Sequence, residues 1–224
     1  MEENNKLIVY IFSFFSANFI ISIILIIFSF IVPRILGPEI YGTYKFLIYL
    51  PSVIITYAPE ADFAMNRFIP YYIENNPGSI IPMIKWNLKI KSIGAIGGII
   101  ILFTYFLLVI QEYALYLYLL IPIFLFNFFS PTLSKILYGF KKIKLLNLIT
   151  ISYQLLYFPL FIILFLFFNL FGAFLGILIC SVFRLILFLY YGKKLILSLP
   201  KNIVNPDKKE LILYNFPYYI LQKG

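Results

Sequence analysis

The sequence predicts an all-α membrane protein with six transmembrane helices, and three observations lead to this prediction. Of the 224 residues, 62% are hydrophobic and only 12% are charged, so the chain lacks the polar surface that a soluble core needs. The apolar residues form runs of about 20 residues, the length of a membrane-spanning helix. The 18 Lys and Arg residues lie mostly between these runs. This arrangement orients membrane proteins and does not form a nucleic-acid-binding face.

The six expected spans cover residues 7–32, 43–63, 88–110, 114–137, 145–169 and 171–191. The first follows MEENNK without a small-residue cleavage site, which indicates a retained span rather than a signal peptide. Residues 1–200 are expected to form one transmembrane lobe. Residues 201–224 would be a cytoplasmic linker and the truncated start of a seventh span, because the apolar piece at 211–221 is too short to cross.

Basic residues give the expected orientation of the chain. They precede the first span and follow the second, fourth and sixth, with Lys89 and Lys91 at the start of the third. The turns at 111–113 and 169–172 carry no basic residue. The positive-inside rule therefore predicts that both termini lie in the cytoplasm.

The sequence offers little for catalysis or metal binding. It contains no His and one Cys, Cys180, inside an apolar run, so the usual proton shuttle and Cys/His metal spacing are missing. We expect no cofactor, no metal and no enzymatic activity. The enzyme alternative is a membrane glycosyltransferase that uses the ExD spacing of Glu60 and Asp62, but this motif is short and common.

Polar residues follow one face of the second span and its continuation. They are Lys45, Tyr49, Ser52, Thr56, Glu60 and Arg67, spaced by 4, 3, 4, 4 and 7 positions. Asn147, Thr150, Gln154 and Tyr157 repeat the pattern in the fifth span. Spans four and one offer Asn127, Ser130 and Ser134, and Asn18. Such stripes predict a wet cavity, and the alternative is a polar seam between packed helices.

The sixth span carries a ridge of small residues that ends at an arginine. Gly172, Gly176 and Cys180 recur every four residues, which allows another helix to approach closely. Arg184 is the next step of four. A charge at this depth needs a carboxylate, a carbonyl or an anionic substrate as partner, unless it snorkels to the cytoplasmic interface.

Two motifs stand out, RILGPEIYGTYKF at 34–46 and EADFAMNRFIPYY at 60–72. The first resembles the R-x-LG-x-x-x-YG-x-Y signature of the oligosaccharide flippase family, the Wzx-like polysaccharide transporters of the MATE/lipid-flippase exporter superfamily. The second resembles the continuation of that signature, although Phe63 departs from it. The resemblance runs from residue 1 to about residue 220, the N-terminal half of the family. The residues at motif positions are Arg34, Gly37, Tyr41, Gly42, Tyr44 and Arg67.

The resemblance implies one lobe of a two-lobe flippase with a central cationic cavity open alternately to each side. Such a protein moves a lipid-linked glycan, carried on a polyprenyl phosphate or pyrophosphate, across the cytoplasmic membrane of a prokaryote. On this interpretation Arg184, Arg67 and Lys45 contact the anionic headgroup. Ser52, Thr56, Asn147 and Gln154 complete the cavity, and Glu60 and Asp62 serve gating or ion coupling.

Three alternatives remain open at this stage. A multidrug, cation-coupled antiporter of the same superfamily would use Glu60 or Asp62 for coupling. A second alternative is that the chain is an inactive truncated half-transporter that lacks its C-terminal lobe. A parallel homodimer could supply the second lobe, because six spans insert both copies with the same orientation.

Overall fold

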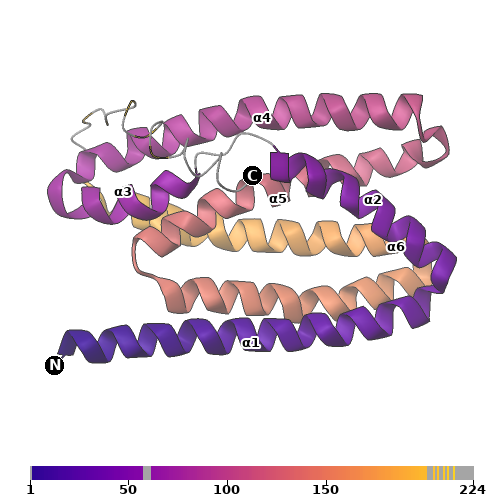
Figure 1. Cartoon of the computed structure of the whole chain (residues 1–224), viewed down its shortest axis with the longest axis horizontal. Helices are drawn as coiled ribbons and strands as arrows, with labels where there is room; N and C mark the ends of the chain where they lie inside the picture. The colour runs from indigo at the N-terminus through magenta and orange to yellow at the C-terminus, as the bar shows by residue number, and fades with distance from the viewer. Residues whose placement is uncertain are drawn as a thin grey trace.

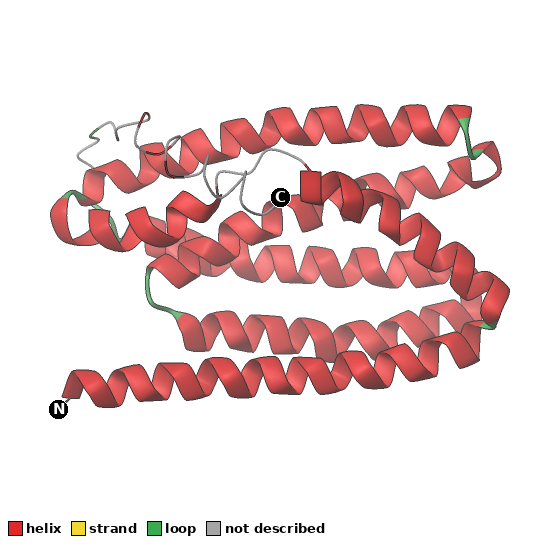
Figure 2. Ribbon diagram, viewed as in Figure 1, coloured by secondary structure: helices red, strands yellow, loops and turns green. Residues whose placement is uncertain are grey.

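The structure, a computed structural model, describes residues 2–57 and 62–200, with Val204, Pro206, Lys209, Leu211 and Tyr214 beyond them. Side chains are described from Phe15 onward. Every regular element in this part is a helix, which confirms the all-α prediction (Figure 2). Four helical segments are long and apolar enough to cross a membrane: Phe15–Leu36, Pro77–Leu108, Gln111–Gly139 and Ile143–Leu197.

The first motif builds the corner between the first two helices. Helix α1 (Glu2–Leu36) and helix α2 (Pro38–Tyr57) meet at Gly37, whose φ is +76°. Glycine adopts this left-handed conformation without the steric penalty of a side chain. The amide of Gly37 donates to the carbonyl of Pro33 at 3.0 Å, and Pro38 then supplies a φ suited to the first turn of α2.

The expected second span, 43–63, falls on two described helices. Helix α2 covers Pro38–Tyr57, residues 58–61 lie outside the described residues, and helix α3 covers Asp62–Asn75. Arg67 therefore lies in a different helix from Lys45, Ser52 and Thr56.

The next helices return along the bundle. The chain turns through the 3-10 helix η1 (Pro77–Ser79) into helix α4 (Ile80–Leu108), which begins eight residues before the predicted third span at 88. A second 3-10 helix, η2 (Gln111–Tyr116), connects α4 to helix α5 (Leu117–Gly139). In Figure 1, α4 and α5 lie in antiparallel orientation on either side of this connection.

Helix α6 (Ile143–Leu197) is 55 residues long and contains a sharp reversal at Asn169, where φ is 52° and ψ is −140°. Its two halves coincide with the fifth and sixth predicted spans and pack against each other. A side chain at Gly172 would collide with the backbone carbonyl of Leu164, and one at Gly176 would lie 3.2 Å from the Cα of Phe161. This confirms that the small-residue ridge allows a close helix approach.

The helices form a bundle in which α1 and the first half of α6 lie on one side and α4 on the other (Figure 1). The largest buried cluster joins α1, α2, α4, α5 and α6 through residues such as Phe28, Tyr44, Phe124, Phe161 and Phe174. A second cluster joins α3, α4 and α5.

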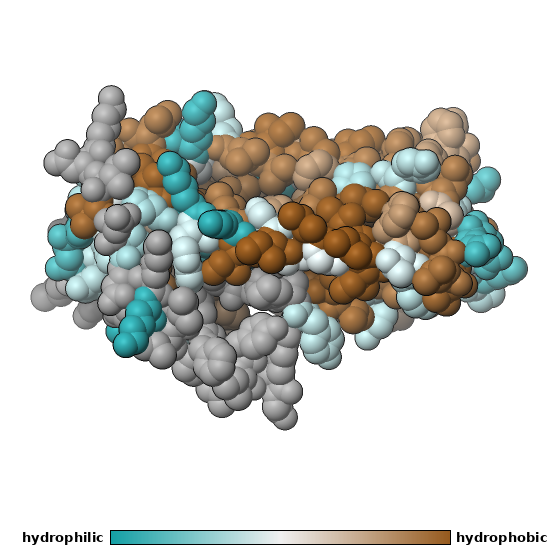
Figure 3. Space-filling model, turned by 90° about the horizontal axis from the view of Figure 1, so that it is seen from above, coloured by the Kyte–Doolittle hydropathy of each residue, from teal (hydrophilic) through white to brown (hydrophobic). Residues whose placement is uncertain are grey.

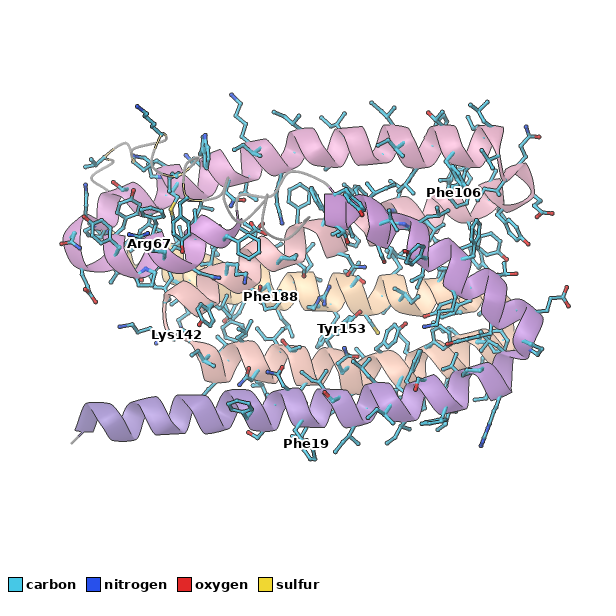
Figure 4. The ribbon with its side chains drawn as sticks, viewed as in Figure 1. Phe19, Arg67, Phe106, Lys142, Tyr153 and Phe188 are labelled. Atoms are coloured by element: carbon cyan, nitrogen blue, oxygen red, sulfur yellow. The ribbon has the colours of Figure 1, made fainter. Side chains whose placement is uncertain are left out.

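The outer surface is strongly apolar. Phe19 points away from the other helices and is 67% exposed (Figure 4). The face in Figure 3 carries apolar side chains along its middle, with hydrophilic ones gathered mainly toward the two ends. A belt of this kind suits contact with lipid rather than water.

Candidate functional site

An open cavity of about 490 Å³ lies between α1, α5 and the two halves of α6. Its lining is mostly polar or charged on the side of α5 and α6. The lining residues are Asn18, Ile21, Asn127, Ser130, Pro131, Ser134, Lys135, Leu146, Asn147, Thr150, Arg184 and Phe188. The cavity thus brings together six polar residues of the predicted spans one, four and five: Asn18, Asn127, Ser130, Ser134, Asn147 and Thr150.

Arg184 contacts one side chain from α5 and one from the first half of α6. Its Nη2 donates a hydrogen bond to Oδ1 of Asn127 on α5 at 2.6 Å. Its guanidinium lies 4.3 Å from the ring centre of Tyr153, which comes from the first half of α6 (Figure 4). Planar guanidinium groups stack favourably on aromatic rings, so both contacts fix the orientation of the charge.

The cavity has a positive electrostatic character. Arg184 and Lys135 both line it, and no Asp or Glu occurs among its described lining residues. The Nε of Arg184 and the hydroxyl of Ser130 are buried without a hydrogen-bond partner in the described part of the chain. A buried donor without a partner is unfavourable, so these groups suit a ligand that accepts hydrogen bonds.

Of the residues predicted to contact the transported lipid-linked glycan, Arg184 and Asn147 line the cavity. Gln154 lies two turns beyond Asn147 on the same half of α6, half-buried and outside the lining. Tyr157, from the same predicted stripe, packs instead on α2 through a hydrogen bond of 3.0 Å between its hydroxyl and that of Tyr44.

The predicted residues of α2 lie on the outer face of the described chain. Lys45, Ser52 and Thr56 are exposed, and none lines the cavity. The hydroxyls of Ser52 and Thr56 donate to carbonyls one turn earlier in α2, each at 2.9 Å. The ammonium of Lys45 lies 5.4 Å from the ring centre of Tyr41. Self-satisfied hydroxyls of this kind are compatible with a lipid-facing helix.

Arg67 also lies apart from the cavity. Arg67 is exposed on α3, and its guanidinium lies 5.0 Å from the ring centre of Tyr214 and 5.6 Å from that of Phe68. Glu60 lies outside the described residues.

Asp62 is the centre of a second, buried polar group. Its carboxylate accepts hydrogen bonds from Lys91 of α4 at 2.5 Å and from the Thr132 hydroxyl of α5 at 2.8 Å. Lys91 also donates to the backbone carbonyl of Phe128 at 2.8 Å. The positive-inside rule counted Lys91 among the basic residues at the cytoplasmic side of the membrane, whereas its side chain is fully buried. The sequence signal for this pair is that Asp62 and Lys91 lie at similar distances along the chain from the turn at 76–79. A hairpin of α3 and α4 about this turn brings such residues together.

The residues of the first motif serve the α1–α2 corner and its packing. Arg34 is exposed in the last turn of α1, where a cation complements the helix dipole. Gly37 makes the corner, and Gly42 is exposed. Tyr44 is buried against Phe161 of α6 (ring centres 5.2 Å apart), with half-buried Tyr41 beside it.

Comparison of the chain with protein-family models, with curated proteins and with solved structures finds no match.

Proposed function

We propose that this chain is a transporter lobe that moves a lipid-linked oligosaccharide or polysaccharide precursor across the cytoplasmic membrane of a prokaryote by alternating access. The observation that carries the proposal is the cationic cavity between α1, α5 and α6. Arg184 and Lys135 line it without an opposing carboxylate among the described residues.

The chemistry of the cavity suits the headgroup of such a lipid. A phosphate or pyrophosphate accepts hydrogen bonds and carries negative charge, which Arg184 and Lys135 would neutralise. Surrounding amides and hydroxyls, including Asn127, Asn147 and Thr150, match sugar hydroxyls. The polyprenyl chain would remain in the apolar surroundings of the bundle.

The arrangement of the helices supports six spans with both termini in the cytoplasm. The two halves of α6 supply the fifth and sixth crossings, and α2 with α3 supplies the second. In Figure 4, Arg67 and Lys142 lie toward the end of the bundle at which α1 begins. This is the end that the positive-inside rule assigns to the cytoplasm.

The test is Arg184→Gln, which removes the charge and keeps a polar, uncharged side chain. Translocation is measured in proteoliposomes as protection of a lipid-linked oligosaccharide from a glycosidase added outside. We expect Arg184→Gln to insert normally and to lose translocation. The control Lys193→Gln neutralises an exposed charge on the same helix, α6, and should behave like the wild type. Normal translocation by Arg184→Gln would overturn the assignment.

The alternative function, a multidrug antiporter, can be distinguished from glycan translocation in the same proteoliposomes. It needs a cavity that attracts cations, whereas the described lining carries two cations and no carboxylate. Gradient-driven efflux of a cationic dye from the same proteoliposomes, without glycan translocation, would favour the rival.

A further inference from the structure

Asp62 of α3 and Lys91 of α4 form a buried ion pair. Asp62 lies in the first described turn of α3. It is 2% exposed, and its partner Lys91 is 0% exposed.

Two side-chain amides, each one helical turn along the chain from a member of this pair, have buried atoms without a partner in the described part of the chain. Oδ1 and Nδ2 of Asn87 and Oδ1 of Asn66 are buried without a hydrogen-bond partner in the described part of the chain. Asn66 is four residues after Asp62, and Asn87 is four residues before Lys91. Because α3 and α4 form a hairpin about the turn at 76–79, the contact between Asp62 and Lys91 places both amides one turn nearer the hairpin's closed end.

We propose that this cluster is a sodium-binding site at which Na⁺ competes with the Lys91 ammonium for the Asp62 carboxylate. The site would use oxygen ligands from three helices, the type that hard monovalent cations prefer. The candidate ligands are the carboxylate of Asp62, the hydroxyl of Thr132, the carbonyl of Phe128 and the amide oxygens of Asn66 and Asn87.

Na⁺ and the Lys91 ammonium would pair with the Asp62 carboxylate one at a time. A buried carboxylate needs a counter-charge, and Lys91 supplies it in this structure. Two cations on one carboxylate in a low-dielectric interior would repel strongly. The ammonium is a point charge on a flexible stem, so it can leave Asp62 when Na⁺ arrives.

The site has a direct connection to the cavity. Thr132 lies on α5 beside Pro131, which lines the cavity. Lys135, also in the lining, lies 5.9 Å from the ring centre of Phe63, the residue after Asp62. Exchange at Asp62 would therefore act on the helix that forms one wall of the cavity.

The first experiment removes the internal competitor. Purified Lys91→Gln in detergent is unfolded thermally in NaCl and in choline chloride at equal ionic strength. We expect its Tm to rise by several degrees as Na⁺ replaces choline, because a ligand that binds the folded state stabilises it. The wild type should show a smaller rise over the same range. A Tm of Lys91→Gln that is indifferent to Na⁺ would overturn the proposal.

Two controls separate a bound ion from general salt effects. Asp62→Asn/Lys91→Gln keeps the polar shape but removes the carboxylate, and it should lose the sodium dependence. Lys89→Gln removes a neighbouring exposed charge and should respond as the wild type does. An equal Na⁺ response in the Asp62→Asn/Lys91→Gln protein would contradict the site.

A second measurement covers the case in which Lys91→Gln does not fold. Equilibrium dialysis of the wild type with radioactive sodium should detect binding that Asn87→Leu weakens, and equal binding by both would contradict the site. Neither measurement uses a transported substrate, so failure of the sodium site and failure of the proposed translocation remain distinguishable.

Discussion

Lys91 and Asp62 stabilise each other, and the effect of removing either one should depend on the other. Lys91→Met leaves a carboxylate buried without its counter-charge, which we expect to destabilise the protein by about 3–5 kcal/mol. The double replacement Asp62→Leu/Lys91→Met should recover most of that loss, because neither charge then remains unpaired. Thermal unfolding in choline chloride measures all variants, with the exposed Lys89→Met as control. Additive losses in the double variant would show that the two side chains are not coupled.

Sequence periodicity identified only part of the residue-scale picture. Arg184 and Asn147 were predicted from helical spacing, and the structure brings both into one cavity. Lys91 was counted with Lys89 among the basic residues at the cytoplasmic start of the third span. Its pairing with Asp62 joins residues 29 positions apart, and local charge density carries no information about such a contact.

At the scale of elements, the hairpin within α6 depends on glycine at two positions and tolerates a side chain at a third. Gly172→Ala should be the most destabilising, by about 1–3 kcal/mol, because its Cβ meets the rigid carbonyl of Leu164. Gly176→Ala should cost less, since its contacts begin at 3.2 Å. Gly192→Ala is the matched control on the same helix. Its Cβ would meet nothing within 4 Å, so the better helix propensity of Ala should stabilise by about 0.5–1 kcal/mol.

The order of Tm values should therefore be Gly192→Ala, then Gly176→Ala, then Gly172→Ala. If Gly172→Ala unfolds at the same temperature as Gly192→Ala, the close packing of the two halves of α6 is wrong.

The elements themselves were predictable where hydrophobicity is continuous. Apolar runs located α1, α4, α5 and both halves of α6, although α4 begins eight residues earlier than expected. Of the predicted second span, residues 43–57 lie in α2 and Asp62 and Phe63 lie in α3, while residues 58–61 lie outside the described residues.

At the scale of the whole molecule, a hydrophobic bundle with an internal cavity can be anticipated from composition and polar stripes. The outer position of Lys45, Ser52 and Thr56 could not be anticipated in the same way. Helical spacing places these residues on one face, but it does not say whether that face meets another helix, the cavity or lipid. Only the packing of α2 on α1, α4 and α5 fixes the direction in which the stripe points.

The orientation of the molecule gives the last prediction. If the protein crosses the membrane six times with both termini in the cytoplasm, the ends of the bundle face opposite sides. In a Cys180→Ala background, Glu112→Cys in η2 should react with an impermeant maleimide added outside intact cells, because Glu112 is exposed between α4 and α5. Lys142→Cys and Lys193→Cys, both exposed, should react only after the membrane is opened. Labelling of Lys142→Cys from outside would reverse the orientation. Labelling of Lys142→Cys and Lys193→Cys from different sides would show that the two halves of α6 do not both cross.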